Sequence, residues 1–202
     1  MKKLFFAILA AMIMTSCSTA YMAKYNVVLS QVEKPSDAGQ QFGETAITTV
    51  TEGEISRYYF EDEYIQIYWR VTPQQFLFEL KNKGSHTIKI DWDAITFVDI
   101  NGRAGRVIHE GVRYTDKNNS QASTNIPRNA RISELLLPVE NIQWNGYNWV
   151  TLSLIPSYYS TAQAMNEGKG VYLGCKMSIL FPIEIAGVTN DYIFEFLVKD
   201  VY

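Results

Sequence analysis

Residues 89–109 read KIDWDAITFVDINGRAGRVIH and predict a long β-strand, a tight turn at Asn101-Gly102 and a return strand. Apolar and polar residues alternate in the first part of this stretch, as they do in a strand with one face in a core. Beyond Ala94 both alternating positions are apolar. This predicts a β-bulge near Asp93–Ala94 or a strand covered on both faces. The Asn-Gly pair favours a type I′ hairpin turn, in which both central residues have positive φ.

The composition favours strands throughout the chain. Aromatic residues make up 13% of the 202 residues, and charged residues only 19%. Aromatic and β-branched side chains suit the pleated, half-buried surface of a sheet, so this balance leans towards β-structure. The formal net charge of −3 provides no general attraction to nucleic acid. We therefore expect no nucleic-acid partner.

Short alternating runs recur along most of the chain, separated by turn residues. Asn82-Lys83-Gly84 and Asn145-Gly146 are expected as hairpin turns. One short helix is expected over Ser160–Glu167, because Ser160 and Gln163 have capping-box spacing and Gly168 is a suitable stop. The expected strands are 25–29, 46–51, 65–71, 75–80, 88–100, 107–108, 132–139, 149–155, 172–184 and 192–198.

This pattern predicts an all-β protein, an Ig-like antiparallel β-sandwich with at most one short helix. We expect a single domain over residues 25–202, with 25–54 as a candidate peripheral segment. Trp92 is the candidate core tryptophan. No cysteine pair flanks it, which excludes an antibody-type domain.

The N-terminus has the features of a bacterial lipoprotein signal peptide. Met1-Lys2-Lys3 is a positive region, and Leu4–Met14 is an apolar run too short to span a bilayer. Met14-Thr15-Ser16-Cys17 then resembles a lipobox, although Leu is commoner than Met at its first position. The resemblance implies a signal peptide over residues 1–16, lipid on Cys17 and a lipidated tether over 17–24. Ordinary secretion is the alternative.

The residues after Cys17 indicate which membrane would hold the lipoprotein. Ser18-Thr19-Ala20-Tyr21 has no aspartate at its second position, which by analogy with sorting rules argues against inner-membrane retention. We expect an outer-membrane lipoprotein that faces the periplasm, with the cell surface as the alternative. Once Cys17 is lipidated, Cys175 has no partner for an intramolecular disulfide.

The stretch Phe78–Asn141 resembles a group of bacterial envelope lipoproteins of unassigned function. The resemblance implies a lipoprotein with one sandwich domain, and it supplies no catalytic residue. Its markers are Ile90-Asp91-Trp92-Asp93, Phe97-Val98-Asp99, Asn101-Gly102, Arg106-Val107-Ile108-His109, Gly111-Val112-Arg113-Tyr114-Thr115-Asp116, Ile126-Pro127 and Pro138-Val139-Glu140-Asn141.

Arginines gather in the predicted second hairpin and in the long polar loop that follows it: Arg103, Arg106, Arg113, Arg128 and Arg131. Arginine suits bidentate binding of carboxylate or phosphate, so an anionic ligand or an acidic partner is one interpretation. Because aspartates and glutamates are equally concentrated there, we favour internal pairing.

A second group of candidate contact residues is aromatic. Trp144, Tyr147 and Trp149 surround the predicted Asn145-Gly146 turn. If exposed, they can stack on sugar rings or hold a partner protein. We favour burial at the rim of the core, since large aromatic side chains are mostly buried.

No residue pattern points to catalysis, a metal or another cofactor. His86, His109, Asp91 and Asp93 match no metal-site spacing. Cys175 with His109 is a conceivable nucleophile and base, but a small buried thiol is the simpler interpretation of Cys175. The sequence thus favours a non-catalytic lipid-anchored protein for envelope interaction or assembly. A glycan-binding module is the alternative, and a hydrolase around His109 the weaker one.

Overall fold

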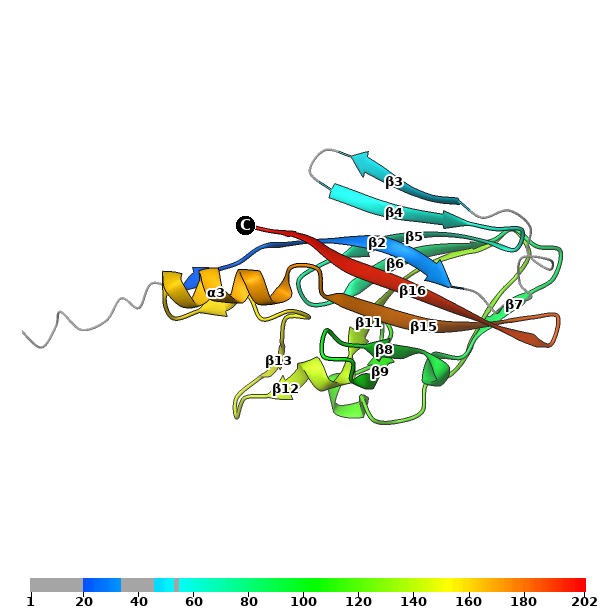
Figure 1. Ribbon diagram of the computed structural model, residues 1–202. Coiled ribbons are helices and arrows are strands. Elements are labelled where there is room, and N and C mark those ends of the chain that lie inside the picture. The colour runs from blue at the N-terminus through cyan, green and yellow to red at the C-terminus, as the bar shows by residue number, and fades with distance from the viewer. Residues whose placement is uncertain (1–19, 34–45, 53–54) are drawn as a thin grey trace, which may run out of the picture.

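Antiparallel strands dominate the computed structural model, which describes residues 20–33, 46–52 and 55–202 (Figure 1). The predicted signal peptide and Cys17 lie outside the described residues. The strands are β1 (Tyr21–Met22), β2 (Tyr25–Glu33), β3 (Ala46–Glu52), β4 (Ile55–Glu61), β5 (Ile65–Val71), β6 (Phe76–Asn82), β7 (Ile88–Ile90), β8 (Thr96–Val98), β9 (Ala104–Ile108), β10 (Thr124–Ile126), β11 (Arg131–Pro138), β12 (Ile142–Trp144), β13 (Trp149–Thr151), β14 (Tyr158–Tyr159), β15 (Lys176–Ile185) and β16 (Val188–Val201).

Two groups of strands face each other. In the first, β4 pairs with β3 and β5, and β6 pairs with β5 and β11. In the second, β16 pairs with β2 and β15, and β15 also pairs with β7 and β8. The pairing of β9 with β11 connects the groups, since β9 also pairs with β8. The result is the predicted all-β architecture, with a sandwich-like core between the groups.

Trp69 on β5 occupies the centre of this core. Its ring centroid lies 5.1 Å from that of Phe78 on β6. Across the core it lies 6.0 Å from Phe181, 5.1 Å from Phe194 and 5.6 Å from Phe196, which belong to β15 and β16. Trp92 is also buried, but it packs against Phe78 and stacks on His109 away from this centre.

The apolar faces predicted from alternation are the buried faces. The core includes alternate residues of four strands, and Val71 at the end of β5 is half-buried. The buried alternate residues are Ile65, Ile67 and Trp69 of β5, Phe76, Phe78 and Leu80 of β6, Ile88 and Ile90 of β7, and Tyr192, Phe194, Phe196 and Val198 of β16.

The stretch 89–109 is not the continuous strand that its pattern predicts. Trp92–Ala94 forms a 3-10 turn, η2, in which the Asp91 carboxylate accepts a hydrogen bond from the Asp93 N–H at 3.1 Å. β7 and β8 flank this turn and both pair with β15, so η2 interrupts the strand where a bulge was predicted. Pro182 lies on β15 between the two pairings, and it has no N–H to offer to a ladder.

The Asn101-Gly102 signal correctly predicts the β8–β9 hairpin but not the turn type. Only Gly102 has positive φ, at 77°, whereas a type I′ turn requires it at both central residues. The Asp99 carboxylate accepts hydrogen bonds from the N–H groups of Asn101 and Arg103 at 2.8 and 2.9 Å. These bonds favour a longer turn closed over Asp99.

Asn82-Lys83-Gly84 is not a hairpin turn, because β6 and β7 belong to different groups of strands. The chain crosses between the groups here. The buried Asn82 amide supports the crossing by donating to the carbonyls of His86 and Ile126 at 2.7 and 2.9 Å. A polar side chain at this depth needs such partners.

One α-helix is present in the described ranges, α3 (Ala162–Tyr172), close to the predicted place. Its cap is Thr161 rather than Ser160, and the Thr161 hydroxyl accepts from the Ala164 N–H at 3.0 Å. Gly168 does not end the helix. Its Cα lies against the Tyr159 ring, so closely that a Cβ would collide with it, and this contact accounts for a glycine inside the helix.

We expect Trp69→Ala to lower the free energy of unfolding by about 3–5 kcal/mol, because it leaves a cavity in the centre of the core. Trp144→Ala deletes the same ring from a site that is 54% exposed, and should cost below about 1 kcal/mol. Urea unfolding of the two purified variants tests the difference. Equal losses would contradict the central position of Trp69.

Candidate functional site

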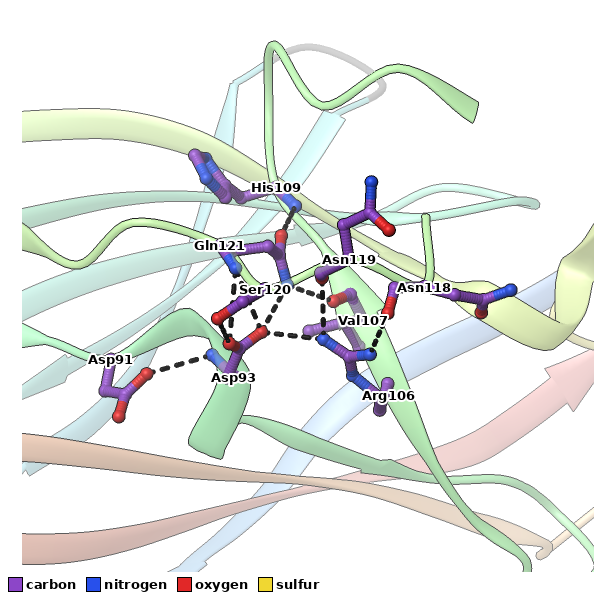
Figure 2. A network of polar contacts seen from close by, with 9 residues as sticks. All are labelled: Asp91, Asp93, Arg106, Val107, His109, Asn118, Asn119, Ser120 and Gln121. Atoms are coloured by element: carbon purple, nitrogen blue, oxygen red, sulfur yellow. Dashed lines mark hydrogen bonds and ion pairs between the residues drawn. The ribbon is translucent and has the colours of Figure 1, made fainter. Parts of the chain in front are cut away.

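The predicted arginine cluster begins with a network around Asp93 of η2 (Figure 2). The Asp93 carboxylate accepts from Arg106 Nη2 at 2.7 Å, from the Ser120 hydroxyl and from the Gln121 N–H. The hydrogen bond from Ser120, supported by those from Gln121 and Arg106, holds the pKa of Asp93 below its ordinary value despite partial burial. This carboxylate is therefore held ionised, which is the opposite of what a general acid needs.

The same network fastens the polar loop to the β8–β9 hairpin. Arg106 donates to the carbonyls of Asn118 and Asn119 at 2.9 and 3.0 Å. Gln121 donates to the Val107 carbonyl at 2.9 Å and accepts from the His109 N–H. Both terminal nitrogens of Arg106 thus bond within the fold, which agrees with internal pairing.

The other arginines do not converge with Arg106. Arg131 pairs with Glu79 on the neighbouring strand at 3.1 Å. Arg103, Arg113 and Arg128 are exposed, and no interaction of their side chains occurs within the part of the chain that the structure describes. None of these five arginines lines the apolar cavity beside Leu154 and Met177 or the hollow over the first group of strands. The five arginines do not form one anion site.

His109 and Cys175 lie in different environments. His109 stacks on Trp92 with ring centroids 4.3 Å apart, and its Nδ1 lies 3.6 Å from Glu134 Oε2. The Cys175 thiol donates to the Val171 carbonyl at the end of α3. These contacts do not form a nucleophile–base pair. Among residues 20–33, 46–52 and 55–202, no group of three or more His, Cys, Asp or Glu side chains is arranged to hold a metal.

The aromatic group forms an exposed tip. Trp144, Tyr147 and Trp149 are 54%, 86% and 36% exposed, so the expectation of burial is wrong. Trp144 and Trp149 are directly paired across β12 and β13, with ring centroids 5.7 Å apart. Figure 1 shows this hairpin projecting from the body of the protein. Tyr114 lies edge-on to the Trp149 ring, with centroids 6.4 Å apart, and Lys117 Nζ lies 6.0 Å from its centre, whereas Trp144 and Tyr147 project further into solvent.

Specific contacts hold the tip in position. The Asn145 carboxamide accepts from the N–H groups of Tyr147 and Asn148 at 3.0 and 2.8 Å, and Gly146 supplies the positive φ of 97°. At the base, Lys117 Nζ donates to the carbonyls of Val139 and Ile142. These bonds fix the backbone of the tip, so less backbone freedom is left to lose on binding.

The β12–β13 hairpin and the residues that follow it, as far as β14, form one end of the molecule. We call this stretch, Ile142–Tyr159, the end segment. Beyond β13 its backbone bonds to other parts of the fold: the Leu154 N–H donates to the Pro73 carbonyl at 2.7 Å, and the Ser157 carbonyl accepts from the Ala23 N–H at 2.8 Å. Its last strand, β14, pairs with β1 at the start of the described chain. The hairpin, α3 and β1 therefore share one end, as Figure 1 shows.

An apolar cavity of about 380 Å³ lies against the end segment. This volume falls within the range of small-molecule sites. Its walls come from separate parts of the chain, namely Met22, Ala23, Lys24, Tyr25, Val27, Val71, Thr72, Pro73, Gln74, Ser153, Leu154, Ile155, Ser157, Tyr158, Met177 and Tyr202.

A second hollow, of about 400 Å³, is shallower and carries charges of both signs. It lies over the first group of strands and includes Arg57, Arg70, Glu79, Glu110 and Glu134. Mixed charge of this kind gives no preference for one class of ligand.

Sequence reasoning found the aromatic tip but missed the cavity. Tyr25, Val71 and Met177 each look like ordinary strand residues, and only the tertiary fold brings them together. The one available signal was the density of Trp and Tyr over 144–159, which marks the segment but not the hollow beside it.

Comparisons with known proteins do not assign the chain. No protein-family model matches it. No curated protein sequence matches it either. One solved structure, the X-ray structure of Northeast Structural Genomics Consortium target SoR45, is similar over 86% of this chain and 89% of its own, with 12% identity and a TM-score of 0.30. Within the described residues, no helix has the length and apolar character needed to cross a membrane.

Asp93→Asn should lower the free energy of unfolding at pH 7 by about 1–3 kcal/mol, because it weakens charge-assisted hydrogen bonds. The folded protein lowers the Asp93 pKa, so this stabilisation is present above the unfolded pKa of about 4 and is lost as pH falls through the folded value. The difference between wild type and variant should therefore shrink below about pH 4.

Urea unfolding between pH 3 and 7 measures this difference. Asp191→Asn is the matched control, since Asp191 is exposed and no side-chain interaction of it occurs in the described ranges. A loss that stays constant with pH would contradict the ionised role of Asp93.

Proposed function

We propose that this chain is a non-catalytic, lipid-anchored protein of the bacterial outer membrane that faces the periplasm and binds another envelope protein through the β12–β13 hairpin. The exposure of Trp144, Tyr147 and Trp149 is the observation that carries the proposal. Exposed Trp and Tyr on a rigid support are typical anchors of protein interfaces. The lipobox-like Cys17 and the resemblance to envelope lipoproteins support the location.

The proposal includes two finer features of the chain. Residues 1–16 act as the signal peptide, and Cys17 carries the lipid. The sandwich is Ig-like in the loose architectural sense, with two antiparallel groups of strands around a buried tryptophan, which is Trp69.

Glycan binding is the second candidate, favoured by the same exposed rings. A sugar stacks on one open aromatic face, and Trp144 and Tyr147 have the exposure that this requires. The Trp144 and Trp149 planes are inclined at 61°, so the pair has no common flat platform. This geometry suits the irregular surface of a protein better than an extended sugar chain. For the hydrolase, the low pKa of Asp93 and the separate settings of His109 and Cys175 provide no support.

The anchor can be tested directly. We expect Cys17→Ala to abolish incorporation of labelled palmitate into the full chain, because the acylated thiol and the processing site are lost together. Labelling of cells followed by isolation of the protein is the measurement, and Cys175→Ala is the matched control. Unchanged palmitate incorporation in Cys17→Ala would refute lipidation at Cys17.

The binding surface needs a separate test. A photoreactive phenylalanine analogue at Tyr147 should crosslink the chain in cells to a discrete envelope protein, because this side chain is the most exposed of the tip. The same analogue at Val188, which is 60% exposed at the start of β16, is the control. Trp144→Ala should reduce the crosslink about tenfold or more. Equal products from both positions would refute the hairpin as the interface, and glycan-array binding lost in Trp144→Ala would favour the second candidate.

A further inference from the structure

The cavity beside the end segment has a predominantly apolar lining. Most of its wall is apolar, with Met177, Leu154 and Ile155 among its buried members. Alkyl and thioether groups dominate this wall, so a ligand gains from the cavity mainly by burying apolar surface.

The polar side chains of the wall that are not exposed, namely Tyr25, Thr72, Ser153 and Ser157, are already hydrogen-bonded within the fold. The Tyr25 hydroxyl donates to the Pro156 carbonyl at 2.6 Å, and burial raises the pKa of this phenol, which keeps it a donor. The Ser153 and Ser157 hydroxyls bond to each other at 3.1 Å. The Thr72 hydroxyl donates to the Gln75 carbonyl at 2.9 Å. These groups have little left to offer a polar ligand.

This pairing discriminates between classes of ligand. A peptide or a sugar would bring N–H, C=O or hydroxyl groups into the cavity, and each unpaired one costs free energy. An alkyl chain brings none. The polar side chains at the mouth, such as Lys24 and Gln74, are exposed, so a polar or anionic head group would remain there in water.

The position of the cavity points to a source of alkyl chains. Met22, Ala23, Lys24 and Tyr25 form part of the wall, and Cys17 precedes Met22 by five residues. Five extended residues span at most about 18 Å. A lipid on Cys17, or a lipid of the membrane that it anchors, is therefore within reach of the mouth.

We propose that this cavity is a lipid site that takes one alkyl chain, with the head group at the mouth beside Lys24. The chemistry of the site depends only on its lining. Its proximity to a membrane rests on the lipid anchor proposed above. The alkyl chain comes from Cys17 of the same molecule or from a free lipid, and the experiment separates these sources.

The experiment uses the full chain in living cells fed with palmitic acid that carries a photoreactive diazirine. After irradiation, mass spectrometry of the digested protein locates the crosslinks. Met177 is the diagnostic residue, because it is 1% exposed and lies in the cavity wall. We expect an alkyl adduct on Met177 or on the buried Ile155. Joining of the Met177 and Cys17 peptides identifies the chain's own lipid, and a free lipid adduct that persists in Cys17→Ala identifies the other source.

A cavity-filling variant supplies the matched comparison. Val27→Phe places a ring in the cavity and should lower the Met177 adduct at least about tenfold, since each displaced methylene is worth roughly fourfold in affinity. Val188→Phe adds the same ring to an exposed position at the start of β16 and should leave the adduct unchanged. If near-ultraviolet circular dichroism shows that Val27→Phe is unfolded, Val71→Phe replaces it.

Adducts confined to exposed residues outside the cavity wall, such as Val171 and Leu173, or an unchanged yield in the folded cavity-filling variant, would overturn the proposal. The same digest reports acylation of Cys17 independently. A Met177 adduct without acylated Cys17 would refute the proposed anchor but support the lipid site. Acylated Cys17 without a Met177 adduct would support the anchor but refute the lipid site.

Discussion

The contact of Trp69 with Phe181, Phe194 and Phe196 is the interaction on which the rest of the structure depends. In the described part of the chain, the two groups of strands share backbone pairing only through β9 and β11. Side-chain packing and buried hydrogen bonds, such as the one from the Tyr192 hydroxyl to the Asp62 carboxylate at 2.8 Å, also hold them together, and Trp69 and Trp92 are the largest fully buried side chains. Because β15 and β16 are positioned by this contact, the turn η2 and the polar loop attached through Asp93 are positioned by it as well.

The proposed protein-binding hairpin and the proposed lipid site both involve the end segment. Its first part projects the aromatic tip into solvent, and its last part pairs with β1 and closes the apolar cavity. A chain anchored at Cys17 would therefore hold a protein-binding hairpin and a lipid site close to the membrane at the same end. By contrast, Asp93 and Arg106 are conspicuous charged residues in the sequence, but their hydrogen bonds only attach the polar loop to the β8–β9 hairpin.

Local patterns predicted well what depends on local geometry. Alternation identified the buried faces of β5, β6 and β16, because a pleated strand directs alternate side chains to opposite sides. The same reasoning failed at Asn82-Lys83-Gly84. These residues permit a chain reversal, but they do not select the strand that follows as a pairing partner. It also failed for Trp144 and Tyr147, whose exposure depends on whether another element covers the hairpin.

The amino-acid sequence by itself determined the all-β class, the hairpin at Gly102 and the approximate place of the one described helix, because these follow from periodicity and turn chemistry, although the helix is capped by Thr161 and continues past Gly168. It also carries the lipobox-like motif on which the anchor proposal rests. Only the tertiary structure decided that Trp69 is central, that the arginines are dispersed and that Tyr25, Val71 and Met177 share a cavity. Each of these facts depends on contacts between residues far apart in the chain, and one-dimensional spacing does not encode such contacts.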